Sequence, residues 1–309
     1  MHRSAIYFFV LISLLLVGCS PTSKSDQDLT VIAAEGFLAD IAQNVAGDRV
    51  EVGVLLPQGT DAHTYQPSPK DIALITDSDL FIINGFGMET WLETSISTAD
   101  QSLNILEASH GLTPRTLQSG HSDDDNAGDG SGHEHEIDPH YWLDPINVVT
   151  YVDNIANALI AIDPEGKQVY EANAKNYKIK LMELDEWIKS QVAEIPAEKR
   201  RLITNHESLG YFADRYGFEI VATILEGSST DSAISSTHMI ELIEMIKRDQ
   251  IDTIFLSTEE NDTLARQLAD EAGVNINYDL ISHSLSDEGE TSTYIGMMRH
   301  NVQVLSVLK

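Results

Sequence analysis

Four histidines of this 309-residue chain lie in loops beside predicted strands or helices. They are His63 (LLPQGTDAHTYQPSP), His140 (DPHYWLDP), His206 (RLITNHESLGYF) and His283 (YDLISHSLSDEG). His206 directly follows an apolar run, the position at which open parallel sheets place their ligands. A single loop histidine is usually an ordinary surface residue. Four of them indicate a metal site, because neutral imidazole binds transition metals and loops on rigid scaffolds carry binding residues.

Three more histidines lie in one polar segment. Residues 119–138 read SGHSDDDNAGDGSGHEHEID, with seven carboxylates and four glycines, and His121, His133 and His135 lie among them. Such a composition cannot bury enough apolar surface to fold, so we expect a disordered surface loop. Its histidines and carboxylates would bind divalent cations weakly and reversibly, as an auxiliary to a tighter site.

The chain has a single cysteine, Cys19, at the end of an N-terminal apolar stretch. Residues 1–18 have a short positive start and an apolar run too short to span a bilayer, which is typical of a signal peptide. The sequence Leu-Val-Gly-Cys that ends at Cys19 resembles the lipobox of bacterial lipoproteins, which implies cleavage before this residue and lipid on its sulfur. The polar residues 19–28 would form a tether. We therefore expect an extracytoplasmic, lipid-anchored protein, in the periplasm or at the cell surface.

The charge of the chain restricts its partners. It has 49 acidic residues against 19 Lys and Arg, a formal net charge of −30. Nucleic-acid binding needs a basic surface, so we expect no nucleic-acid partner. An acidic surface attracts cations instead. A single cysteine also excludes a multi-cysteine zinc site.

Short apolar runs alternate with helical patterns, which predicts an α/β fold with mostly parallel sheets flanked by helices. In the first half we expect strands at 29–34, 50–56, 79–85 and 103–106, with helices near 36–46, 68–76 and 88–97 and a further helix from Pro145. In the second half we expect strands at 201–204, 219–223, 252–256 and 274–278, with helices near 207–216, 237–249, 261–272 and 291–307.

The segment 164–195 separates the two halves. Its apolar residues recur at helical spacing, and neither Gly nor Pro interrupts 167–195, so we expect one long helix there. The predicted architecture is an N-terminal lobe (29–163), this linking helix as a rigid strut, and a C-terminal lobe (196–309).

Several of these segments together resemble one known family, the zinc- and manganese-binding solute-binding lipoproteins of bacterial ABC transporters (the adhesin-type, cluster A-I proteins). The resemblance covers nearly the whole chain. Its motifs are PQGTDAHTYQPSPKDI, DPHYWLDP, TNHESLGYFADRYGF, NGFGMETWLE, DPEGKQVYEANAKNYKIKL and YIGMMRHNV. It implies a receptor, expected to be a monomer, that holds one cation between its lobes and delivers it to an ABC permease.

The resemblance also implies a ligand set: His63 and His140 from the first lobe and His206 from the second. The family's fourth ligand is usually an Asp, and His283 stands in its place here. Asp279, Glu207 or a water molecule could take that fourth position instead. Four imidazoles favour Zn²⁺, whereas a carboxylate would shift the preference toward Mn²⁺. Four neutral ligands would also need nearby carboxylates to orient the rings. The candidates adjacent in sequence are Asp61, Asp138, Asp144 and Glu207.

Other functions remain as alternatives. The same fold could serve manganese or iron uptake, metal buffering or adhesion, and the ligands would be the same. A sugar or peptide receptor would leave the histidines unexplained. A zinc metallohydrolase is the distant enzyme alternative, but no HExxH or GxSxG motif occurs, and four protein ligands would leave no open coordination position. We therefore expect a Zn²⁺ receptor and not an enzyme.

Overall fold

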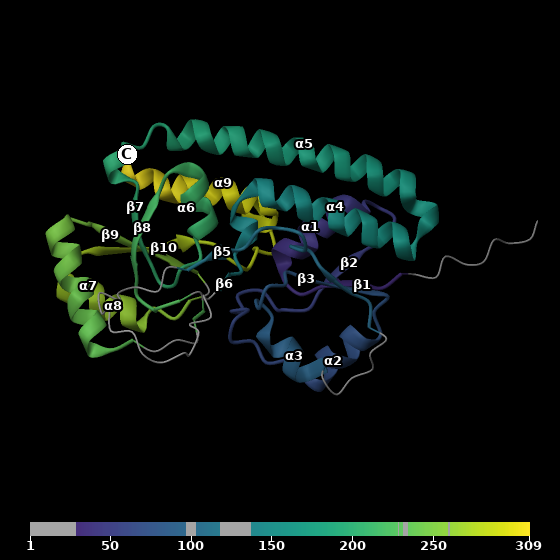
Figure 1. The fold of residues 1–309 in the computed structure, drawn as a ribbon, viewed down its shortest axis with the longest axis horizontal. Coiled ribbons are helices and arrows are strands. Elements are labelled where there is room, and N and C mark those ends of the chain that lie inside the picture. Colours follow the sequence, from purple (N-terminus) through teal and green to yellow (C-terminus); the bar gives the residue numbers. More distant parts are fainter. Residues whose placement is uncertain (1–28, 97–102, 118–136, 228, 231–233, 259) are drawn as a thin grey trace, which may run out of the picture.

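The computed structural model describes residues 29–96, 103–117, 137–227, 229–230, 234–258 and 260–309. The predicted signal peptide, tether and lipidation site at Cys19 lie outside these residues, as do His121, His133 and His135. Two α/β lobes lie side by side, and one long helix runs across both (Figure 1). The predicted fold class is therefore confirmed.

The first lobe is built on a four-stranded parallel sheet of order β2-β1-β3-β4. Its strands are β1 (Val31–Ala33), β2 (Val52–Val54), β3 (Leu80–Ile83) and β4 (Ile105–Glu107). Its helices are α1 (Gly36–Ala46), α2 (Pro69–Thr76), α3 (Thr90–Ile96) and α4 (Pro145–Ile162). The central strands β1 and β3 are wholly buried because helices cover both faces of the sheet, which explains their uninterrupted apolar sequences.

The helix α4 is long and apolar enough to cross a membrane by composition alone. It packs against α1 and α5 instead, with Val148, Tyr151 and Leu159 fully buried. Asp144 caps its first turn by accepting a hydrogen bond from the backbone N–H of Ile146 at 2.8 Å. This cap fixes where α4 begins, shortly after His140, and so limits the freedom of the segment that carries this histidine.

The second lobe has the same architecture, with a four-stranded parallel sheet of order β10-β9-β7-β8. Its strands are β7 (Arg201–Thr204), β8 (Glu219–Thr223), β9 (Thr253–Ser257) and β10 (Asn275–Leu280). Its helices are α6 (Gly210–Tyr216), α7 (Ser236–Asp249), α8 (Thr263–Ala272) and α9 (Tyr294–Leu305). The strand order changes direction at β7, so the crevice beyond the carboxyl end of β7 is the expected ligand position.

The linking helix α5 (Lys167–Val192) has 26 residues and is therefore about 39 Å long. It contacts α1 and α4 of the first lobe and α6 and α9 of the second (Figure 1). Its buried side chains follow the helical spacing seen in the sequence and include Tyr170, Tyr177 and Leu184. A short 3₁₀ turn, Pro164–Gly166, precedes it, so the helix is slightly shorter at both ends than the predicted 164–195.

The prediction of a disordered loop at 119–138 is wrong at its end. Ile137–Asp138 form a short strand, β6, that pairs antiparallel with β5 (Arg115–Thr116). Asp138 is completely buried. Two strands of two residues each give no alternating pattern, so the sequence offered no sign of this pair. The predicted helix at 207–216 begins only at Gly210, because the preceding residues form the bend that carries His206.

Candidate metal centre

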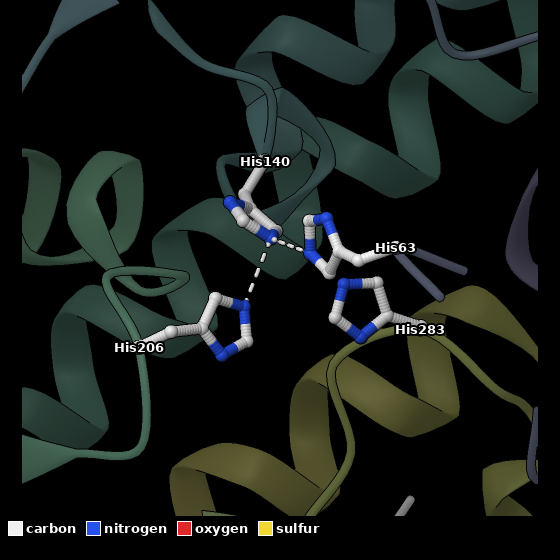
Figure 2. Close-up of side chains that lie close together, drawn as sticks. All are labelled: His63, His140, His206 and His283. Atoms are coloured by element: carbon white, nitrogen blue, oxygen red, sulfur yellow. Dashed lines mark hydrogen bonds between the residues drawn. The ribbon is translucent and has the colours of Figure 1, made fainter. Parts of the chain in front are cut away.

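Four histidine rings converge at the boundary between the lobes (Figure 2). They belong to His63, His140, His206 and His283, hereafter the histidine cluster. One ring nitrogen from each lies within 4.8 Å of those from the other three. The Nε2 atom of His140 is 3.3 Å from Nε2 of His63 and 3.3 Å from Nε2 of His206. An ion bound tetrahedrally at about 2.0–2.1 Å by nitrogen needs nitrogens about 3.3 Å apart, so this spacing suits a metal ion.

The ring of His140 is held by the carboxylate two residues before it. Asp138 Oδ1 accepts from the His140 backbone N–H at 3.0 Å and lies 2.8 Å from the ring Nδ1. Both side chains are fully buried. A hydrogen bond from Nδ1 to the carboxylate leaves the lone pair on Nε2, which faces the other three rings.

The ring of His206 follows β7 and lies against a carboxylate from beside a neighbouring strand. Its Nδ1 lies 2.7 Å from Oε1 of Glu260, which comes just after β9. The other carboxylate oxygen of Glu260 accepts from the backbone N–H of Ser257 at 2.7 Å. Both side chains are almost fully buried, so Asp138 and Glu260 place two carboxylates directly behind two of the imidazoles.

His283 belongs to the second lobe in sequence but is attached to the first. Its Nδ1 lies 2.7 Å from the hydroxyl oxygen of Ser282. The backbone carbonyl of Ser282 accepts from the indole N–H of Trp142, two residues after His140, at 2.7 Å. Asn301 on α9 holds the preceding residue, Ile281, through both its backbone N–H and its carbonyl.

His63 is the one partly exposed member of the cluster. Its backbone N–H donates to Asp61 Oδ1 at 2.9 Å, and Thr230 of the second lobe donates to Asp61 Oδ2 at 2.5 Å. A cavity of about 550 Å³ adjoins this position. It is lined from both lobes, by residues that include Asp61, Thr64, Asn205 and Thr230. A second cavity, about 790 Å³, lies in the first lobe, and none of the four histidines lines either cavity.

The environment of the cluster disfavours protonation of His63 and His140. Burial, together with the neighbouring imidazoles, holds the pKa of His63 and His140 well below the usual value. Burial also raises the pKa of Asp138 to about 7, against the opposing effects of the His140 backbone N–H and Arg115. Neutral imidazole is the form that binds metal, so the environment favours ligation over protonation.

Several carboxylates lie near these histidines in the sequence, and the structure gives them different roles. Asp138 orients a ring. Asp61 binds a backbone N–H and Thr230, and Asp144 caps α4, so neither contacts a ring nitrogen. Glu207 lies outside the cluster, with Oε1 2.5 Å from Nη1 of Arg115. Asp279 lies on β10, is exposed, and is also outside the cluster.

Glu260 was missed by the sequence analysis. It lies 54 positions after His206, and only the pairing of β9 with β7 brings it to the ring. The available signal was its place at the carboxyl end of a predicted strand, the same signal that identified His206. It was too weak to use because the order of strands in a sheet cannot be read from their order in the sequence.

Comparisons with known proteins place the chain beside metal-binding lipoproteins and periplasmic metal-binding proteins. A family model described as the periplasmic component A of the zinc-uptake complex (ZnuA) matches residues 31–307. The manganese-binding lipoprotein MntA of Halalkalibacterium halodurans is 31% identical over 301 residues, 96% of this chain and 95% of MntA. The zinc-binding lipoprotein AdcA of Streptococcus pneumoniae is 31% identical over 309 residues, 99% of this chain but only 60% of AdcA. The solved periplasmic zinc-binding protein TroA of Treponema pallidum superimposes with a TM-score of 0.78 at 26% identity, covering 91% of this chain and 99% of TroA.

Proposed function

This chain belongs to the family of the periplasmic zinc-uptake component A, and on that premise we propose that it captures Zn²⁺ between its lobes and delivers it to an ABC permease. It is a metal-binding receptor of an uptake system and not an enzyme. The relatives are named for zinc and for manganese, so the choice of metal must be argued from this chain's own residues.

The observation that carries the proposal is the all-imidazole composition of the histidine cluster. Four ring nitrogens lie within 4.8 Å of one another, and two of the distances between them are 3.3 Å, which suits Zn²⁺, because this ion readily accepts four-coordination by nitrogen. Mn²⁺ favours carboxylate oxygen and binds nitrogen sites more weakly. We therefore propose that His63, His140, His206 and His283 are the metal ligands.

The charge around the cluster supports a dication. Four neutral imidazoles leave the bound ion with its full charge of +2. Asp138 and Glu260 lie directly behind two of the rings, both nearly inaccessible to water. Two carboxylates in contact with the ligands balance that charge and make the imidazoles stronger donors.

Manganese is the second candidate, because MntA is named a manganese-binding protein and is 31% identical over nearly the whole chain. In this reading the imidazoles would be supplemented by oxygen ligands from water or a carboxylate. The proposed location is extracytoplasmic and membrane-anchored, in keeping with the lipoprotein names of MntA and AdcA.

The test is metal analysis of the mature domain purified without chelator or added metal, followed by titration of the stripped protein. We expect one Zn²⁺ per chain. Replacement of His63, His140 or His206 by Ala should each weaken zinc binding at least about 10-fold. Unchanged affinity in any two of these variants would refute the proposed ligand set. His238 provides a matched control, because it is a histidine of the second lobe that lies outside the cluster.

A further inference from the structure

One guanidinium joins the two lobes beside the histidine cluster. Arg115, on β5 of the first lobe, contacts three carboxylates. Its Nη1 lies 2.5 Å from Glu207 Oε1 and 3.4 Å from Asp138 Oδ2, and its Nε lies 3.0 Å from Asp214 Oδ2. Glu207 and Asp214 belong to the second lobe. Arg115 therefore connects the residue that orients His140 to the residue that follows His206.

The surroundings of Arg115 hold its side chain in this position. Its backbone pairs with Asp138 in the β5–β6 ladder, and its N–H donates to the hydroxyl of Tyr211 at 2.8 Å. That hydroxyl in turn donates to the backbone carbonyl of Asp138 at 3.0 Å. Gly210 leaves room for the guanidinium, since a Cβ there would clash with Nη1. The Arg115 side chain is only 21% exposed and that of Glu207 only 19%.

Glu207 is the carboxylate next in sequence to a proposed ligand, and its side chain leaves the backbone one residue after His206. If it were free, it could approach a metal ion bound at that ring and add an oxygen donor. An added oxygen ligand would favour Mn²⁺ relative to Zn²⁺. The 2.5 Å contact with Arg115 instead directs the carboxylate to the β5–β6 pair.

We propose that Arg115 determines metal specificity by holding Glu207 out of the coordination shell, which keeps the site all nitrogen. This inference rests on the proposed function, because it assumes that the histidine cluster binds the metal. Arg115 is a positioning residue here and does not contact the metal. An arginine suits this role because its rigid, always charged fork binds several carboxylates at once.

The experiment is a double-mutant cycle on the mature protein with four members: the parent, Arg115→Met, Glu207→Gln and the variant that carries both changes. Competition titrations give the Zn²⁺ and Mn²⁺ dissociation constants of each. In Arg115→Met we expect the ratio of zinc to manganese affinity to fall about 10-fold, and in the double variant we expect the parent ratio to return. Arg115→Lys should retain the parent ratio, since its positive charge still binds Glu207.

A purely structural role for Arg115 gives a different result. If the loss of Arg115 disturbed Asp138 and His140, the binding of both Zn²⁺ and Mn²⁺ would weaken together. The weaker binding would then persist in the double variant. Co²⁺ provides an independent readout, because four nitrogens in a tetrahedron give strong visible absorption and an added carboxylate weakens it. We expect weakened absorption in Arg115→Met alone. Arg201→Met is the matched control: this arginine is 29% exposed and paired with Asp249, but it lies at the opposite end of β7 from His206.

An unchanged metal ratio in Arg115→Met, or a changed ratio that persists in the double variant, would overturn the inference. Either result would leave the proposed function intact if the parent still binds one zinc ion through the cluster. A parent protein that binds no divalent cation tightly would instead refute the proposed function itself. If Arg115→Met does not fold, Arg115→Gln takes its place in the cycle, because it also removes the charge that binds Glu207, and the same outcomes support or overturn the inference.

Discussion

The buried carboxylate behind His206 should be worth a measurable share of the zinc affinity. Glu260→Gln removes one negative charge but leaves an amide of nearly the same shape next to Nδ1, where the present distance is 2.7 Å. A dication bound at Nε2 would lie about 6–7 Å from this carboxylate, and their attraction at an effective dielectric constant of 20 is about 5 kcal/mol. An amide of nearly the same shape still places its dipole beside the ring, so we expect only part of this attraction to be lost.

We expect zinc affinity to fall about 10- to 100-fold, or about 1.4–2.7 kcal/mol. Competition against a chelator of known affinity measures this change, and thermal unfolding of the metal-free protein checks that the fold is intact. Glu226→Gln is the matched control, because Glu226 also faces a histidine of the second lobe, His238, but at 3.8 Å, on the surface and outside the cluster. Zinc affinity within twofold of the parent in Glu260→Gln, or an equal loss in Glu226→Gln, would refute the reasoning.

Three further predictions concern the same site. His283→Ala should weaken zinc binding at least about 10-fold. His283→Asp should reduce the difference between the zinc and manganese affinities in competition titrations. Unchanged affinities in both variants would show that His283 is not a ligand. Zinc affinity should decrease as pH falls through about 7, because the pKa of Asp138 is raised to about 7 by burial and its proton must leave when a dication binds. His63 and His140 do not cause this decrease, since their pKa values lie well below the usual 6.5. Asp138→Asn should therefore remove the part of the pH dependence that is centred near 7, and a pH profile of the zinc dissociation constant that is unchanged in that variant would contradict the assignment. Deletion of 119–136 should leave one tight zinc site and remove additional weak binding, as measured by calorimetry; loss of the tight site would make that segment a source of primary ligands.

Local patterns predicted most of the secondary structure. The strands β7 and β8 have the bounds expected from the sequence, and α1 does as well, because each is an apolar run or an amphipathic helix with clear ends. The loop positions of the histidines were equally visible. The convergence of four of them was an implication of the family resemblance, since no spacing in the sequence measures a distance between lobes.

The contacts that support the site could not be predicted, because they join residues far apart in the chain. Arg115 reaches Glu207 across 92 positions, and Trp142 reaches Ser282 across 140. Asp138 appeared to be the end of a polar loop, whereas pairing with β5 buries it. Sequence position identifies which residues can bind a metal, but the sheet order and the lobe contacts decide which carboxylates support them.

The helix α5 has a consequence for the permease as well as for the site. A receptor that closes by a wide hinge rotation presents different overall shapes when loaded and empty, and its transporter can select the loaded shape. Here α5 packs on both lobes, and the segment that carries His283 is fastened to Trp142 of the first lobe. The loaded and empty receptors should therefore differ mainly at the lobe boundary around His63 and Thr230. Empty receptors would then compete with loaded ones for the same permease, and uptake would depend on the fraction of receptors that carry metal as well as on their number.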